Sequence, residues 1–169
     1  MALHARHLPS ALGDQAPHLL ILHGLLGSSD NWQTLGKRYA ASHHVWMLDA
    51  RNHGRSPHAP IHTYEAMAQD IVEFMDARGI AKASLLGHSM GGKTVLLLSQ
   101  LHPERMDKLV VADIAPRAYT PHHGPIFDAL LATDPASAPS RDAIQSQLSK
   151  ALDGDPVLVP FLMKGLHRL

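Results

Sequence analysis

The chain is organised around the stretch Gly87-His88-Ser89-Met90-Gly91, which follows an apolar run at residues 83–86 and precedes a helix-forming segment at residues 92–98. A G-x-S-x-G pattern between a strand and a helix is typical of a sharp turn that exposes the serine hydroxyl. Glycines on both sides of the serine let the strand and the helix approach each other closely. The pattern therefore predicts a buried strand that ends just before Ser89, and it points to Ser89 as a nucleophile for acyl transfer.

Alternating strand and helix signals surround this turn. Continuous apolar runs predict buried strands at residues 18–22, 44–49, 82–87 and 109–113. Residues 2–8 alternate apolar and polar side chains and predict a short edge strand. Helices are expected at residues 31–39 after an Asp30 cap, from Thr63 to Gly79, and at residues 90–101. Strands that alternate with helices in this way predict an α/β fold built on a mostly parallel sheet.

The pattern of secondary-structure signals in the sequence changes after Pro116. Prolines recur there, amphipathic segments replace strand signals, and no strand is expected after Asp113. The amphipathic segments lie at residues 126–131, 141–152 and 156–169. We therefore expect two parts, an α/β core at residues 1–116 and a helical region at residues 117–169.

Composition excludes several classes of function. Fifteen basic and fifteen acidic side chains cancel, so no charged stripe predicts a nucleic-acid partner. The absence of cysteine rules out disulfides and thiolate chemistry. The fourteen histidines are scattered or paired without metal-ligand spacing, so we expect no metal and no other cofactor. No secretory signal and no membrane-spanning run are recognisable, which predicts a cytoplasmic protein with no membrane partner.

An oxyanion hole needs two backbone N–H groups aimed where negative charge develops. Met90 directly follows the predicted nucleophile, so its N–H is the first expected donor. The loop His23-Gly24-Leu25-Leu26-Gly27 follows the strand predicted at residues 18–22. Because the carboxyl ends of parallel strands share one edge, Leu25 is the second expected donor.

The acid and the base of a triad are harder to place. Asp113 ends the strand after the predicted turn and is the expected acid, whereas Asp49 at another strand end fits a structural role better. His88 is expected to point away from its neighbour Ser89, and His23 to order the oxyanion loop. Three further histidines could approach from loops, although sequence alone assigns the base to none of them: His53, His122 and His123.

With these residues in view, the chain resembles the α/β-hydrolase superfamily, and within it the small YbfF-type esterases. The resemblance rests on residues 22–28, 49–57, 64–70, 87–93, 107–109 and 113–116. It implies an α/β-hydrolase fold with helices on both faces of the sheet. It also implies Ser89 as nucleophile, Asp113 as acid and Leu25 and Met90 as oxyanion donors. The implied substrate is a small-molecule carboxylic ester or acyl thioester, hydrolysed through an acyl-enzyme on Ser89.

The resemblance further implies that residues 117–169 are the start of a helical lid. The family continues with two more strands and a loop that carries the catalytic histidine, so we expect the chain to be a fragment without that base. The strand at residues 109–113 would then be an apolar sheet edge open to self-association. Two alternatives stay open: a non-catalytic truncated product, and a lyase or carbon–carbon bond hydrolase of the same superfamily. The latter would need a cationic clamp such as Arg117, Arg141 or Lys164.

Overall fold

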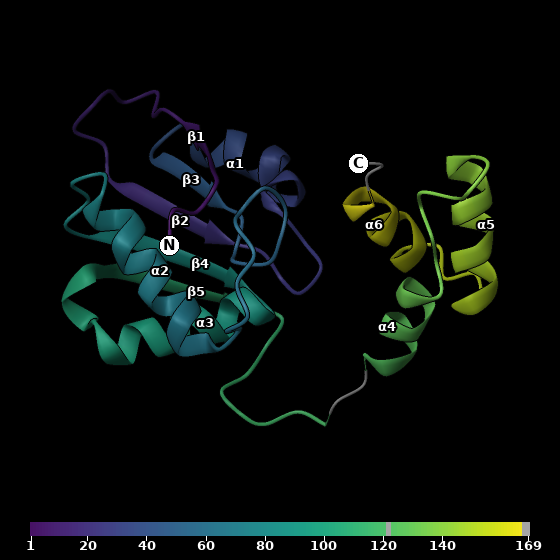
Figure 1. The fold of residues 1–169 in the computed structure, drawn as a ribbon. Helices are drawn as coiled ribbons and strands as arrows, with labels where there is room; N and C mark the ends of the chain where they lie inside the picture. Colours follow the sequence, from purple (N-terminus) through teal and green to yellow (C-terminus); the bar gives the residue numbers. More distant parts are fainter. Residues whose placement is uncertain (121–122, 167–169) are drawn as a thin grey trace. The chain divides into compact units, whose positions relative to one another are not determined.

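The computed structural model describes residues 1–120 and 123–166 and divides into two compact units, Met1–Pro116 and Arg117–Leu169 (Figure 1). In the first unit, strands and helices alternate along the chain, as the sequence predicts. They are β1 (Ala5–Leu8), β2 (His18–Leu22), η1 (Ser29–Trp32), α1 (Gln33–Tyr39), β3 (His44–Leu48), α2 (Tyr64–Asp76), β4 (Ala83–His88), α3 (Met90–Leu101), η2 (Pro103–Arg105) and β5 (Met106–Ala112).

The sheet of the first unit has the strand order β1-β3-β2-β4-β5. The strands β3, β2, β4 and β5 run parallel, and β1 pairs antiparallel with β3 at one edge. This confirms the predicted α/β fold with a mostly parallel sheet. Because the parallel strands share one direction, the segments that follow Leu22, Leu48, His88 and Ala112 emerge at the same edge of the sheet.

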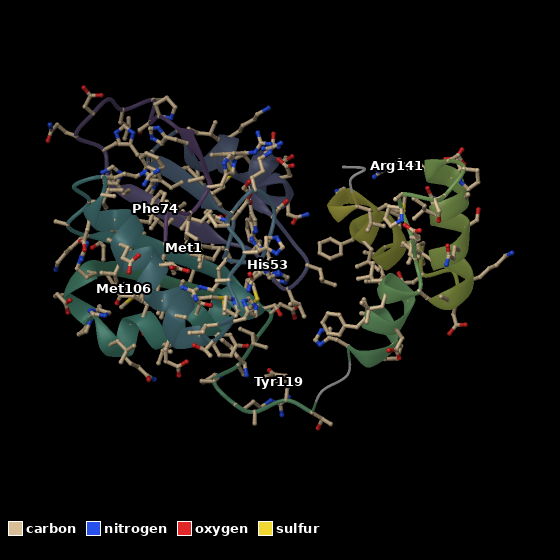
Figure 2. The ribbon with its side chains drawn as sticks, in the orientation of Figure 1. Met1, His53, Phe74, Met106, Tyr119 and Arg141 are labelled. Carbon is tan, nitrogen blue, oxygen red and sulfur yellow. The ribbon has the colours of Figure 1, made fainter. Side chains whose placement is uncertain are left out.

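Helices cover both faces of this sheet, with α2 and α3 on one face and α1 on the other (Figure 1). The alternation of side chains along a strand explains the two layers. Leu20 and Leu22 of β2 pack against apolar side chains of α2 and α3. One of these side chains is Phe74 of α2 (Figure 2). Leu19 and Ile21 belong to the cluster on the opposite face. A strand buried on both sides in this way reads as a continuous apolar run.

The first helical segment has a different N-cap residue from the predicted Asp30. It begins with the turn η1, whose N-cap is Ser28, and the Asn31 side chain accepts from the Ser28 N–H at 2.7 Å. Asp30 instead lies in the first turn, where its carboxylate pairs with Arg6 at 2.5 Å. The helix α2 begins as predicted, since the Thr63 hydroxyl accepts from the N–H of Ala66 at 3.2 Å.

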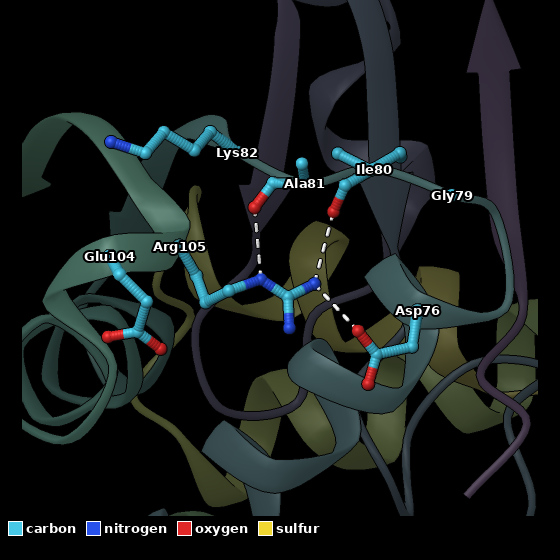
Figure 3. Close-up of a pocket in the computed structure, with 7 residues that line it drawn as sticks. All are labelled: Asp76, Gly79, Ile80, Ala81, Lys82, Glu104 and Arg105. Atoms are coloured by element: carbon cyan, nitrogen blue, oxygen red, sulfur yellow. Dashed lines mark hydrogen bonds and ion pairs between the residues drawn. The ribbon is translucent and has the colours of Figure 1, made fainter.

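A pocket of about 520 Å³ opens at the amino ends of β4 and β5 (Figure 3). Arg105 crosses it, donating to the carbonyl oxygens of Ala81 at 3.0 Å and Ile80 at 3.1 Å and pairing with Asp76 at 2.8 Å. The guanidinium thereby fixes the start of β5 to the end of α2. Because Ser89 follows the carboxyl end of β4, this pocket lies at the other edge of the sheet from the predicted nucleophile.

The described part of the second unit is helical, with α4 (Gly124–Leu131), α5 (Arg141–Ala151) and α6 (Leu158–Gly165). Ser140 caps α5 by accepting from the N–H of Ala143 at 3.1 Å. Arg141 (Figure 2) donates to the carbonyl oxygen of Leu166 at 3.0 Å and also to that of Met163. Ile144, Leu148, Val159 and Leu162 are buried between the helices. The guanidinium predicted as a possible substrate clamp is therefore engaged in joining α5 to α6.

Candidate active site

Ser89 is the single residue between β4 and α3, and its backbone conformation is rare for a residue with a side chain. Its φ is 51° and its ψ is −111°. Such a conformation costs on the order of 1–3 kcal/mol and persists only where the surroundings enforce it. The Ser89 N–H donates to Ala112 at 3.0 Å, and the Ser89 carbonyl accepts from Lys93 at 3.0 Å. The turn is thus held from both β5 and α3.

Two glycines permit this turn because a side chain at either position would meet backbone. A Cβ at Gly87 would overlap the carbonyl oxygen of Gly91, and one at Gly91 would lie 2.7 Å from the carbonyl oxygens of His23 and Leu22. The G-x-S-x-G pattern is therefore explained by packing. Its glycines allow α3 to lie directly against β2 and β4.

The loop after β2 comes to the same place as Ser89. A Cβ built on Gly24 would lie 3.3 Å from the Ser89 Cβ, and the N–H of Gly91 donates to the His23 carbonyl at 3.2 Å. Leu25 packs against a buried cluster that includes Met90. Met90 opens α3, so its N–H has no partner within the helix. Among the described residues, neither the Met90 N–H nor the Leu25 N–H donates a backbone hydrogen bond outside regular helices and strands.

His23 fastens the loop that carries Leu25. Its side chain is buried, with Nδ1 2.7 Å from the Gly24 carbonyl oxygen and Nε2 accepting from the Ala50 N–H at 3.0 Å. Because the Ala50 N–H can only donate, Nε2 carries no proton and Nδ1–H donates to Gly24. Burial lowers the pKa of His23 to about 4, so the imidazole is neutral near pH 7. Its neutral form joins the ends of β2 and β3.

Asp49 has the structural role that the sequence favoured. Its carboxylate accepts from the N–H groups of Ser29 at 2.6 Å and Arg55 at 2.9 Å. Burial alone would raise the pKa of Asp49, but these hydrogen bonds outweigh burial and leave the pKa lowered. The carboxylate therefore holds the two loops that carry Ser29 and Arg55, at the edge of the sheet where the parallel strands end.

A buried ion pair holds the neighbouring turn, and sequence reasoning missed it. Arg51 donates through Nε to Asp70 at 2.7 Å and through a terminal nitrogen to the same carboxylate at 2.8 Å. It also donates to the carbonyl oxygens of Ile61 at 2.9 Å and Ala66 at 3.1 Å. The pair joins residues nineteen positions apart, so no local periodicity reveals it.

Asp113 follows β5 at the edge of the sheet where Ser89 lies. Its φ is 55°, its side chain is 89% exposed, and its Oδ2 is 3.6 Å from His88 Nε2. The pairing register explains this contact, because His88 of β4 lies opposite Ala112 of β5. The His88 ring also meets the Trp32 ring edge-on, with centroids 6.4 Å apart. This carboxylate–imidazole pair beside Ser89 was not foreseen from the sequence.

The histidines considered as bases take different places. His53, near the carboxyl ends of the strands in Figure 2, is buried, and its Nδ1 lies 2.9 Å from the Arg51 carbonyl oxygen. Burial lowers the pKa of His53. His123 precedes α4 in the second unit, and His122 lies outside the described residues. The candidate residues gathered at one edge are therefore Ser89, Leu25, Met90 and Asp113.

The described residues contain no group of three or more His, Cys, Asp or Glu side chains arranged to hold a metal ion. No helix within residues 1–120 and 123–166 has the length and apolar character needed to cross a membrane.

Comparison with known proteins identifies the family. A model of the family described as alpha/beta hydrolase fold matches residues 17–145, which is more than half of this chain of 169 residues. The chain therefore belongs to the alpha/beta hydrolase fold family.

Particular relatives include esterases and lipases. Esterase YbfF of Escherichia coli is 42% identical over 147 residues, which cover 86% of this chain and 58% of that protein. The sn-1-specific diacylglycerol lipase ABHD11 of Mus musculus is 40% identical over 144 residues, covering 80% of this chain and 47% of that protein. A solved marine microorganism esterase superposes with a TM-score of 0.92 at 40% identity, covering 99% of this chain and 64% of that one. The chain thus spans about half to two thirds of these relatives.

Proposed function

We propose that the full-length protein is a serine hydrolase that cleaves small carboxylic esters or acyl thioesters through an acyl-enzyme on Ser89. The observation that carries the proposal is the Ser89 backbone, held at a φ of 51° between β4 and α3 and facing Gly24. A serine in such a turn presents its hydroxyl at the edge of the sheet instead of burying it. The relatives named as esterases and a lipase support the same class.

In the proposed reaction, Ser89 Oγ attacks the acyl carbon while a base removes its proton. The carbonyl oxygen becomes an oxyanion that accepts from the N–H groups of Leu25 and Met90. Collapse of this intermediate expels the alcohol or thiol, which takes up the proton, and leaves an ester on Ser89. Water then attacks that ester by the same route and releases the carboxylic acid. Each oxyanion donor contributes about 3–4 kcal/mol of transition-state stabilisation.

Asp113 is proposed to orient the base. A carboxylate that accepts from one imidazole nitrogen holds the other nitrogen free to take the serine proton. The resemblance places the family's catalytic histidine after two further strands, and the chain spans 58% of Esterase YbfF. We therefore propose that the base is a histidine of the longer protein outside residues 1–169, and that this chain by itself has little or no esterase activity.

The test is hydrolysis of p-nitrophenyl butyrate and of a short acyl thioester by the full-length protein. Ser89→Ala is expected to reduce kcat by about 10⁴-fold or more, because the nucleophile is lost while binding persists. Ser146→Ala, at an exposed serine of α5, is the matched control and should leave both rates unchanged. A fluorophosphonate should label the wild-type protein and fail to label Ser89→Ala. Undiminished turnover by Ser89→Ala would overturn the proposal.

A further inference from the structure

His88 is the last residue of β4 and immediately precedes Ser89, yet the proposed reaction gives it no role. Its side chain is 41% exposed, so the strand does not bury it in the core. In the pairing register His88 lies opposite Ala112 of β5, the residue before the proposed acid Asp113. His88 Nε2 is 3.6 Å from Asp113 Oδ2. The imidazole therefore reaches from the strand that carries the nucleophile to the proposed acid.

Two other segments bound the His88 ring. A Cβ built on Gly24 would lie 2.9 Å from His88 Nδ1 and 3.2 Å from its Cε1, so the ring occupies the space that a side chain at position 24 would need. The Trp32 ring of η1 meets the His88 ring edge-on, with centroids 6.4 Å apart. Because the loop after β2 and the turn η1 both contact the ring, His88 Nε2 faces Asp113 from a defined position.

The Asp113 side chain has much less support. It is 89% exposed, and the backbone φ of 55° lies in the left-handed region that few non-glycine residues adopt. An exposed carboxylate can rotate about its side-chain bonds, and its terminal torsion has no sharply preferred angle. Each rotation changes which oxygen is available to a hydrogen-bond donor. The contact with His88 restricts this rotation.

The chemistry of a carboxylate explains why its orientation matters. A carboxylate accepts hydrogen bonds through two oxygens, and one of them is enough to orient the imidazole of a base. Because a carboxylate only accepts, the His88 nitrogen that faces it is the donor in this contact. The distance of 3.6 Å exceeds that of a normal hydrogen bond, so the contact is mainly electrostatic. With Oδ2 facing His88, Oδ1 of Asp113 is left to accept from the base.

We propose that His88 is a positioning residue that orients the Asp113 carboxylate, an inference that rests on the serine hydrolase function proposed above. His88 acts on the reaction through Asp113, and Asp113 acts through the base. A misoriented carboxylate leaves substrate binding unchanged but weakens the transfer of the Ser89 proton. Loss of His88 therefore lowers kcat and leaves KM unchanged. Loss of an orienting partner of this kind costs about 10–100-fold in activity.

The test is hydrolysis of p-nitrophenyl butyrate by the full-length protein with substitutions at His88. His88→Leu should lower kcat by about 10–100-fold, with KM within about twofold of wild type. In His88→Gln the amide nitrogen can take the place of Nε2 as donor, so this variant should recover most of the loss. His102→Leu is the matched control, because His102 Nδ1 lies 3.5 Å from Glu104 Oε1 in a similar pair at the amino end of β5. It should leave kcat unchanged.

A double-mutant cycle shows whether His88 acts through Asp113. In an Asp113→Asn background, His88→Leu should lower kcat by less than about threefold, because no carboxylate remains to be oriented. An equal loss in both backgrounds would show that His88 acts by another route and would refute the proposal. If His88→Leu does not fold, His88→Phe replaces it in the cycle, since phenylalanine keeps a ring beside Gly24 and Trp32 but has no donor.

The same measurements distinguish failure of this inference from failure of the proposed function. If Ser89→Ala abolishes turnover while His88→Leu keeps the wild-type kcat, the hydrolase function stands and the positioning role of His88 is wrong. A KM that rises while kcat is unchanged would likewise contradict that role, because it would place His88 in substrate binding. If wild-type turnover does not depend on Ser89, both the function and the role of His88 are refuted.

Discussion

At the scale of single residues, the turn at Ser89 depends on glycine because a side chain at Gly87 would meet backbone. A Cβ there would overlap the carbonyl oxygen of Gly91, which no side-chain rotation relieves. We expect Gly87→Ala to destabilise the protein by about 3 kcal/mol or more, through strain of the kind that overpacking produces. Urea unfolding measures it. Gly124→Ala, where a Cβ meets nothing within 4 Å, is the control and should change stability by less than about 1 kcal/mol. Similar losses in the two variants would contradict this account.

His23 is expected to link stability to pH. Its folded pKa of about 4 lies below the unfolded value of about 6.5, so its neutral form stabilises the protein above about pH 6.5. That contribution, about 3 kcal/mol, is lost as the pH falls from about 6.5 to about 4. In His23→Gln the amide oxygen can still accept from Ala50 without titrating. Denaturant titrations across this range should show a shallower acid slope for the variant, and an identical slope would contradict the assignment.

At the scale of elements, the ion pair of Arg51 and Asp70 anchors the turn after β3 to α2. Asp70→Leu should cost about 3–5 kcal/mol because it leaves a buried guanidinium without its partner. Arg51→Met combined with Asp70→Leu should recover most of that loss, since neither charge of this pair then remains. The Met1 ammonium, which lies 3.0 Å from Asp70, keeps its second partner Glu73. The exposed pair of Arg6 and Asp30 provides the contrast, and Asp30→Asn should cost less than about 1 kcal/mol. Thermal unfolding that finds the double variant as unstable as Asp70→Leu would count against this explanation.

The elements also show what the sequence can predict. The strands β2, β3 and β4 were predictable because a strand buried on both faces is apolar at every position. The turn at Ser89 was predictable because its glycines and flanking elements are adjacent in sequence. The contact of His88 with Asp113 depends instead on the pairing register of β4 with β5. The pair of Arg51 with Asp70 likewise depends on the packing of α2. The N-cap at Ser28 was missed for a local reason, because Asp30 is also a residue type that caps helices.

At the scale of the whole molecule, β5 borders the sheet within the described residues and presents an unpaired strand edge. Its Val110 side chain is 50% exposed, so the edge combines free backbone groups with apolar surface. We expect the 169-residue chain to associate with itself as its concentration rises. Sedimentation velocity over a hundredfold range of concentration measures this association.

A charge on that edge should suppress the association, because pairing would bury an ammonium group against a second copy. Val110→Lys is therefore expected to shift the chain toward monomer by about tenfold in concentration, a change of about 1.4 kcal/mol. Leu101→Lys is the control. Leu101 is 52% exposed, but it is the last residue of α3 and does not lie on a sheet edge. If both substitutions weaken association equally, general surface hydrophobicity is responsible and not the edge. A chain that stays monomeric over the whole range would show that β5 does not recruit a second copy.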